Sequence, residues 1–111
     1  MLKKGDKVPN FSLKGIDANG HFRYIDLSDF EDKNIVLYFY PADGTQNCTI
    51  EACAFRDKLN TINRAVVIGI SSDSVQSHAL FREQYFLNFN LLSDEDHIVS
   101  DMFGAWDDEK G

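Results

Sequence analysis

Hydrophobic and polar residues alternate in two short segments near the start of the chain and form continuous apolar runs further along it. The early segments, around residues 11–13 and 21–27, are separated by Asn19-Gly20, a pair typical of tight hairpin turns, and therefore predict a β-hairpin. The runs Ile35–Tyr40 and Ala65–Ile70 are β-branched or aromatic and of strand length, which indicates strands buried on both faces. Leu91-Leu92 predicts a further short strand.

Three other segments have the spacing of helices, over about residues 47–63, over about residues 75–86 and shortly before Gly104. Apolar residues in the first segment recur every three or four positions and form one stripe. The members of that stripe are Ala52, Phe55, Leu59 and Ile62. Polar residues suited to capping precede each helix. These candidates are Thr45 or Asn47 for the first helix, Asp73 or Ser74 for the second, and Asp94 or Asp96 for the third, which Gly104 ends.

The resulting order is hairpin, strand, helix, strand, helix, strand, helix. Alternation of this kind is typical of an α/β fold with a parallel core. The 111 residues are enough for one compact domain, so we expect residues 1–111 to form a single domain.

Composition and charge narrow the possible functions. Hydrophobic residues make up 43% of the chain, which is typical of a folded core. The net charge of −7 disfavours a general nucleic-acid binder, because an acidic surface repels phosphates. No apolar run approaches the roughly 18 residues of a membrane span. The first residues lack the apolar segment of a signal peptide, so a cytoplasmic location is expected.

Cys48 and Cys53 are the only cysteines, too few for a disulfide scaffold or for a structural zinc site. They could be buried thiols that act as small hydrophobic groups, or a redox pair. Cys48 is expected in the first turn of a helix, where free backbone N–H groups and the helix dipole favour thiolate over thiol. The thiolate is the nucleophilic form, and Cys53, deeper in the same helix, lacks this support.

The spacing of the two cysteines also limits how they can pair. On an ideal helix, Cα atoms five residues apart are separated by about 8.6 Å. A disulfide requires Cα atoms within about 7 Å. A Cys48–Cys53 bridge would therefore require the first turns of the helix to unwind.

The segment from Phe39 to Cys53 resembles the active-site segment of peroxiredoxins, and most closely that of the Q-type subfamily, also called bacterioferritin comigratory proteins. It contains Pro-x-x-x-Thr-x-x-Cys after a buried strand, followed by Thr-x-Glu-x-Cys. Four further segments match in order and spacing, so that the resemblance covers essentially the whole chain. They are residues 5–13, 27–30, 67–74 and 91–94.

The resemblance implies a thioredoxin-like fold and a thiol-dependent peroxidase that needs no metal or organic cofactor. By position, Cys48 would be the nucleophile that attacks a hydroperoxide, and Cys53 the resolving cysteine. Thr45 would hydrogen-bond the thiolate or peroxide, Pro41 would shield the cysteine from water, and Glu51 would orient an arginine. The implied partners are a hydroperoxide substrate and thioredoxin or a similar dithiol. A monomer or weak dimer is expected, with no nucleic-acid or membrane partner.

Two departures from the family pattern change these expectations. Gln46-Asn47 stands where the family usually has Pro-Gly, which should loosen the start of the helix. Family members also continue for roughly forty residues beyond the segment that resembles 103–106, with two strands, a helix and the catalytic arginine. None of Arg56, Arg64 and Arg82 matches the motif of that arginine, and Arg23 is left as a formal possibility. The chain is therefore expected to be part of a longer protein and to leave one edge of strand 35–40 open.

Other interpretations stay open at this point. A thiol–disulfide oxidoreductase or redox sensor could use the same two cysteines. A non-catalytic fragment with an exposed sheet edge would associate with increasing concentration. The three histidines are interpreted as surface or core residues, and Phe103 and Trp106 as core anchors. The acidic residues 94–96 and 107–109 are interpreted as a solvated loop and as charge at a helix start.

Overall fold

The computed structural model describes residues 10–30, 33–58 and 65–103, and within them the predicted order of elements is confirmed. The elements are β1 (Ser12–Ile16), β2 (Phe22–Asp26), a 3-10 helix η1 (Leu27–Phe30), β3 (Asn34–Phe39), α1 (Gln46–Lys58), β4 (Ala65–Ser71), α2 (Val75–Tyr85), β5 (Asn90–Ser93) and α3 (Ile98–Met102). The part of the first predicted helix beyond Lys58 lies outside the described residues.

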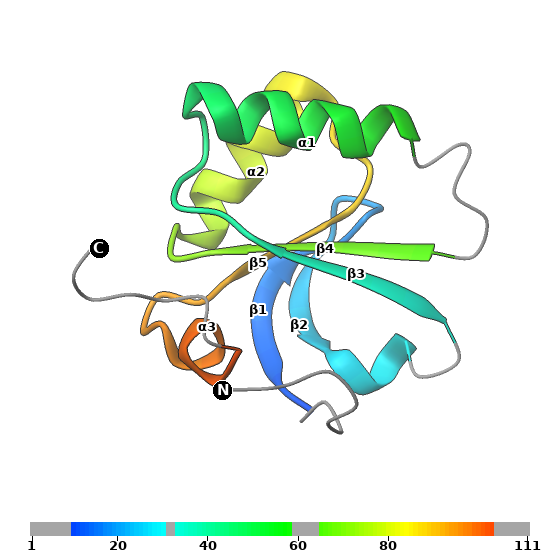
Figure 1. Ribbon diagram of the computed structural model, residues 1–111, viewed down its shortest axis with the longest axis vertical. Helices are drawn as coiled ribbons and strands as arrows, with labels where there is room; N and C mark the ends of the chain where they lie inside the picture. The colour runs from blue at the N-terminus through cyan, green and yellow to red at the C-terminus, as the bar shows by residue number, and fades with distance from the viewer. Residues whose placement is uncertain (1–9, 31–32, 59–64, 104–111) are drawn as a thin grey trace.

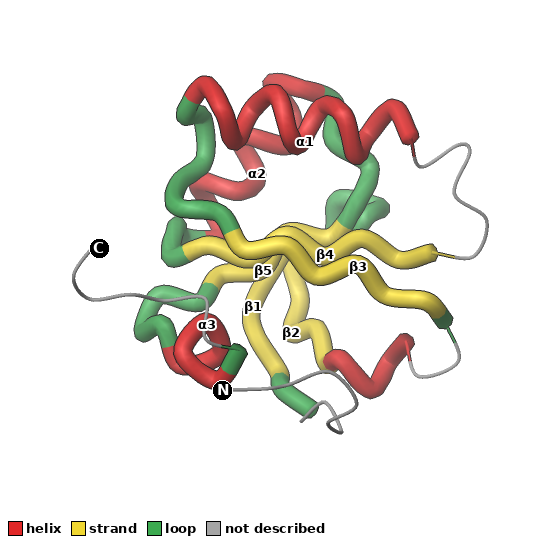
Figure 2. Tube along the Cα trace, viewed as in Figure 1, coloured by secondary structure: helices red, strands yellow, loops and turns green. Residues whose placement is uncertain are grey.

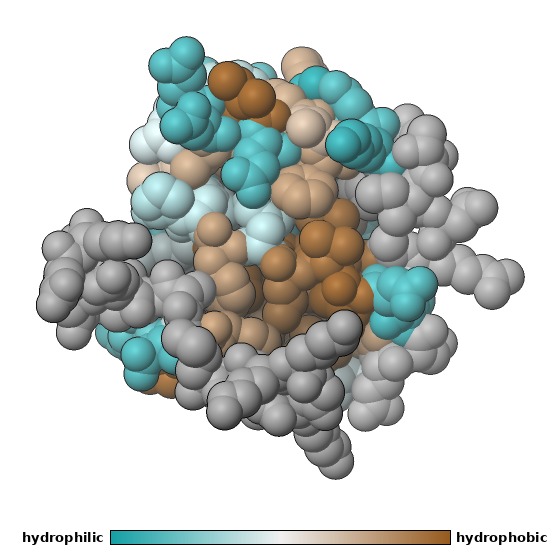
Figure 3. Space-filling view, viewed as in Figure 1, coloured by the Kyte–Doolittle hydropathy of each residue, from teal (hydrophilic) through white to brown (hydrophobic). Residues whose placement is uncertain are grey.

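The five strands form one mixed sheet in the order β2-β1-β5-β4-β3 (Figure 1). Strands β3, β4 and β5 run parallel, whereas β1 is antiparallel to both β2 and β5. Strand β3 pairs with β4, with Leu37 opposite Ile68. Within the described residues β3 is an edge strand, and hydrophobic side chains gather over it on the surface (Figure 3).

The sheet separates two hydrophobic cores. Helices α1 and α2 cover one face, and α3 and η1 lie against the other (Figure 2). Neighbouring residues of β4 and β5 point to opposite faces, as the two-residue period of a strand requires. Val67 and Leu91 therefore join the core beneath α1 and α2, whereas Ile68 and Leu92 join the core beside α3.

Hydrogen bonds at the starts of α2 and α3 test the predicted capping residues of these two helices. Ser74 caps α2, because its hydroxyl accepts the N–H of Ser77 at 3.1 Å. The third helix begins at Ile98, later than predicted, and His97 precedes it with φ 60°. Asp94 still supplies the acceptor, because its carboxylate receives the N–H groups of Val99 and Ser100.

Asp94 lies at a helix start as predicted, but it is not solvated. Its side chain is buried by the hydrogen bonds to the start of α3, whereas Glu95 and Asp96 are exposed. Phe103 is a core anchor as predicted, since its ring packs edge-on against Phe11 with centroids 6.0 Å apart. Gly104, Trp106 and the acidic residues 107–109 lie outside the described residues.

Candidate active site

Cys48 is the third residue of α1, directly after the loop that leaves β3. Its predicted place in the first turn of a helix is confirmed. Only 5% of Cys48 is exposed, and it packs in the core beneath α1 together with Tyr38, Tyr40 and Ala52. Backbone N–H groups at the start of a helix lack intrahelical partners and stabilise negative charge nearby. The fold therefore places the Cys48 thiol at the N-terminal end of α1, beside these N–H groups.

Cys53 lies in the same continuous helix and is half-buried. Both cysteines are free thiols. This arrangement agrees with the expectation that an intact helix keeps them apart. The predicted apolar stripe of α1 is confirmed for Ala52, which is fully buried, and for Phe55, which packs against the same core. Its other two members, Leu59 and Ile62, lie outside the described residues.

The remaining predicted site residues surround the start of α1. Pro41 and Thr45 lie in the loop between β3 and α1, and both are exposed. The Thr45 hydroxyl donates to the carbonyl of Ala42 at 3.3 Å, and the Thr45 carbonyl accepts the N–H of Thr49 in the first turn. Glu51 is exposed on α1. The structure thus brings Thr45 and Cys48 to the same helix start.

The arginines within the described residues bind to groups elsewhere in the chain. Arg23 contacts the carboxylate of Asp17 at 2.9 Å, on the hairpin. Arg56 donates to the carbonyl of Tyr85, and Arg82 donates to the carbonyl of Ala18. Arg64 lies outside the described residues.

Sequence reasoning missed a buried polar cluster beneath residues 40–45, the loop that leads from β3 into the helix of Cys48 and is called the cysteine loop below. The carboxylate of Asp43, with its side chain 6% exposed, lies 2.7 Å from Nδ1 of the fully buried His78. It also accepts the hydroxyls of Tyr40 at 2.6 Å and Ser77 at 2.9 Å. The interpretation of His78 as a core residue is correct, but a spacing of 35 residues between Asp43 and His78 gave no signal of their pairing.

Two tyrosines beneath α1 are held in their neutral forms. Burial raises the pKa of Tyr40, and the adjacent carboxylate of Asp43 raises it further. Burial also raises the pKa of Tyr38, with added contributions from the negative charges of Glu51 and Cys48. Neither phenol is therefore expected to ionise at neutral pH in the folded chain.

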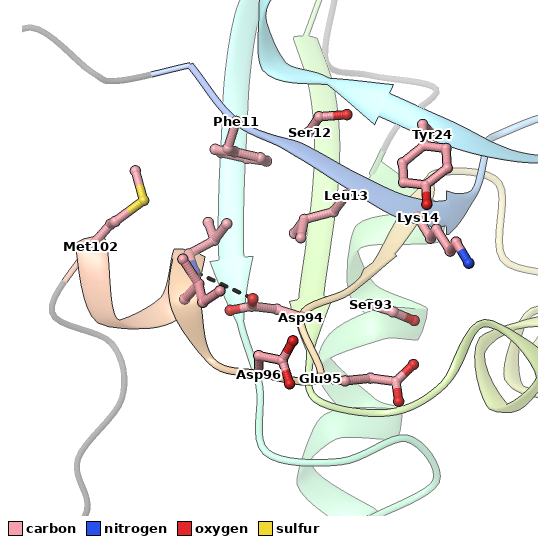
Figure 4. A pocket seen from close by; sticks show the side chains of 12 residues that line it. Phe11, Ser12, Leu13, Lys14, Tyr24, Ser93, Asp94, Glu95, Asp96 and Met102 are labelled. Carbon is pink, nitrogen blue, oxygen red and sulfur yellow. Dashed lines mark hydrogen bonds between the residues drawn. The ribbon is translucent and has the colours of Figure 1, made fainter.

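Two hollows in the surface lie away from the cysteines. A cavity of about 490 Å³ lies between β1 and the segment that leads into α3 (Figure 4). Its lining includes Phe11, Leu13 and Met102 together with the carboxylates of Glu95 and Asp96. Another cavity, of about 580 Å³, adjoins the hairpin around Phe22 and Tyr24. Neither lining includes Cys48 or Cys53.

Neither a membrane span nor a metal cluster occurs in the described part of the chain. None of its helices has both the length and the apolar character needed to cross a bilayer. No group of three or more His, Cys, Asp or Glu side chains in this part is placed to hold a metal ion.

Comparison with known proteins shows which family this chain belongs to. The family model described as "AhpC/TSA family" matches residues 4–111. Over 107 residues the chain is 42% identical to Peroxiredoxin Bcp of Escherichia coli K12, covering 95% of this chain and 66% of that protein. The chain thus spans slightly less than two thirds of that relative's length.

Solved structures agree with the sequence comparison. The crystal structure of peroxidoxin BcpB from Mycobacterium tuberculosis superimposes with a TM-score of 0.82 at 40% identity, over 94% of this chain and 67% of that one. A structure of the bacterioferritin comigratory protein from Xanthomonas campestris, solved to explain its alkyl peroxide reduction activity, gives a TM-score of 0.75 at 30% identity, over 85% and 59% of the two chains. The thioredoxin-like fold is therefore confirmed, and the chain belongs to the AhpC/TSA family, within its peroxiredoxin Bcp or Q-type group.

Proposed function

We propose that this chain carries the reaction centre of a thiol-dependent peroxidase that reduces hydrogen peroxide and alkyl hydroperoxides. The observation that carries the proposal is the buried Cys48 in the first turn of α1, within a chain that matches the AhpC/TSA family along nearly its whole length. The alkyl peroxide reduction activity of the Xanthomonas campestris bacterioferritin comigratory protein supports the same substrate class.

In the first step, the Cys48 thiolate attacks the terminal oxygen of the hydroperoxide. The S–O bond forms as the O–O bond breaks, the alkoxide or hydroxide leaves with a proton as alcohol or water, and Cys48 becomes a sulfenic acid. The sulfur is oxidised by two electrons and the peroxide is reduced by two.

In the second step, the thiol of Cys53 attacks the sulfur of the Cys48 sulfenic acid, the S–O bond breaks, and water leaves. The product is a Cys48–Cys53 disulfide. An external dithiol, such as thioredoxin, then reduces this disulfide by exchange and is itself oxidised to a disulfide. Because α1 is continuous from Gln46 to Lys58, this second step requires its first turns to open.

Three further residues have proposed roles in the first step. The Thr45 hydroxyl, which donates to Ala42 in this structure, would turn towards the thiolate or the peroxide. Pro41 would shape the entrance to Cys48. Glu51, exposed on α1, would orient an arginine that the described residues do not supply. The need for no metal or organic cofactor, the single domain and the cytoplasmic location stay predictions.

Peroxide consumption by the reduced chain, with a dithiol as electron donor, tests this function. The Cys48→Ser variant should lose consumption. The Cys53→Ser variant should consume about one equivalent quickly and then continue only at the slower rate at which the dithiol attacks the Cys48 sulfenic acid directly, because no internal disulfide can form. A Cys48→Ser variant that consumes peroxide as fast as the parent chain would refute the assignment. Disulfide exchange without peroxide consumption would favour an oxidoreductase or redox sensor instead.

A second candidate function follows from the sheet edge. Within the described residues β3 pairs only with β4, and its apolar residues other than Tyr38 are half-buried. Unpaired edges promote association. A non-catalytic chain of this kind would show concentration-dependent association without peroxide consumption. Sedimentation velocity over a hundredfold range of concentration would detect it, and would also test the predicted monomer or weak dimer.

A further inference from the structure

The loop between β3 and α1 is tied to the body of the fold through one buried carboxylate. Asp43 lies between Pro41 and Thr45, and its side chain accepts hydrogen bonds from the phenol of Tyr40 and the hydroxyl of Ser77. It also lies 2.7 Å from Nδ1 of His78. The backbone N–H of Asp43 donates to the carboxylate of Asp73 at 2.7 Å. These contacts connect the loop to the residue that follows β3, to α2 and to the turn that follows β4.

The imidazole of His78 also joins α2 to β5 of the sheet. Its Nε2 lies 2.9 Å from the carbonyl of Leu92 in β5, and its side chain is fully buried. Both ring nitrogens therefore face oxygen acceptors, Leu92 on one side and Asp43 on the other. The Tyr40 phenol lies closer to Asp43, at 2.6 Å, than to Nδ1 of His78, at 3.3 Å. The separation of 2.7 Å between Nδ1 and the Asp43 carboxylate is that of a short hydrogen bond.

We propose that Asp43 and His78 are positioning residues for Cys48: their buried hydrogen bond fixes the loop that leads into α1 and thereby sets how the first turn presents the thiol. This inference rests on the proposed function. A displacement of about 1 Å in a reacting group is enough to lower a rate by about a hundredfold.

Two substitutions of His78 separate its two hydrogen bonds. In His78→Asn the side-chain amide can occupy the place of Nδ1 and keep the contact to Asp43, while the contact to Leu92 is lost. In His78→Gln the longer side chain can reach the Leu92 carbonyl but not Asp43. Both changes remove a buried imidazole and should lower stability. His78→Gln and Asp43→Asn remove the Asp43–His78 hydrogen bond that holds the cysteine loop, whereas His78→Asn keeps it.

Asp94→Asn is the matched control. Asp94 is also a buried carboxylate with several hydrogen bonds, but it holds the start of α3 on the opposite face of the sheet from Cys48. Its loss should lower the melting temperature without moving the cysteine loop. Tyr40→Phe, which removes one of the hydrogen bonds to Asp43, provides a milder test if Asp43→Asn does not fold.

The readout is the second-order rate at which Cys48 reacts with iodoacetamide in a Cys53→Ser background, measured beside its rate with hydrogen peroxide. We expect both rates to fall at least about tenfold in His78→Gln and Asp43→Asn, and to stay within about threefold of the parent in His78→Asn and Asp94→Asn. Both rates of Tyr40→Phe should lie between those of these two groups of variants. Equal rates for His78→Gln and His78→Asn, or for Tyr40→Phe and the parent, would overturn the inference. If the parent chain does not reduce peroxide, the proposed function fails, whereas the iodoacetamide rates still decide the role of the anchor.

Discussion

Tyr38 and Tyr40 stack on the same face of the sheet with ring centroids 5.3 Å apart, but only one of their hydroxyls has a partner among the described residues. The Tyr40 hydroxyl donates to Asp43, whereas the Tyr38 hydroxyl is buried without a hydrogen bond. Tyr40→Phe should therefore cost about 1–3 kcal/mol of the free energy of unfolding, because it leaves a carboxylate short of a donor. Tyr38→Phe should be neutral or stabilising. Urea unfolding at pH 7 measures both, and a larger loss in Tyr38→Phe would contradict this prediction.

The same two tyrosines predict instability in alkali. Burial raises the pKa of both in the folded chain. Their contribution to stability is complete below the ordinary tyrosine pKa of 10.0 and decreases as the pH rises from there towards the raised pKa. The decline is at most about 1.4 kcal/mol per pH unit for each tyrosine. Urea unfolding between pH 8 and 11 should show it, and Tyr38→Phe should decline less steeply. Tyr24→Phe, at a position 63% exposed, is the control and should follow the parent chain.

The elements of the fold could be predicted because local patterns determine them. The continuous apolar run that contains Leu37 is a strand, as sequence alone indicated, and of the two candidate caps before Val75 the serine caps the helix. Cys48 in the first turn of α1 was predictable for the same reason. The Asp43–His78 pair was not, because it joins residues far apart in the chain, and neither residue has a local role that requires the other. Burial of Asp94 likewise depends on where α3 packs.

Oxidation should change the helicity of α1. Cys48 and Cys53 lie in one helix, where their Cα atoms are expected about 8.6 Å apart, farther than a disulfide allows. After one equivalent of peroxide, peptide mapping should find the Cys48–Cys53 bridge, and amide hydrogens of residues 46–53 should exchange faster. Cys53→Ser treated in the same way should keep the protection of the reduced chain. A bridged chain with unchanged protection in α1 would show that the helix need not open.

Acid should weaken the hairpin through Asp17. Burial alone would raise the pKa of Asp17, but hydrogen bonds from the backbone of His21 and the side chain of Arg23 outweigh it and hold the pKa below its usual value of 3.8. The contribution of this carboxylate is therefore present above about pH 4 and lost as the pH falls through the lowered pKa. Asp17→Asn should cost about 1–3 kcal/mol at pH 7 and less at pH 3.

Asp29 provides the control for this effect, because it contacts the same arginine from an exposed position. Its carboxylate lies 3.6 Å from Arg23, and both side chains are more than 40% exposed. Exposed ion pairs contribute about 0–1 kcal/mol, so Asp29→Asn should change stability little at either pH. Unfolding free energies of the two variants at pH 7 and pH 3 check both expectations. Equal losses for the two variants would show that burial of Asp17 does not matter.

Gly44 joins the anchored residue Asp43 to the start of α1 with a φ of 79°, in the left-handed region that favours glycine. A Cβ at this position would meet no atom within 4 Å, so that any cost of a side chain comes from the backbone alone. Gly44→Ala should therefore lower the free energy of unfolding by about 1–2 kcal/mol, and Gly44→Asn by less, because asparagine adopts this conformation more readily. Chemical unfolding of the two variants tests the order. If both variants are as stable as the parent, the loop does not require the left-handed conformation at this residue and can reach α1 by another path.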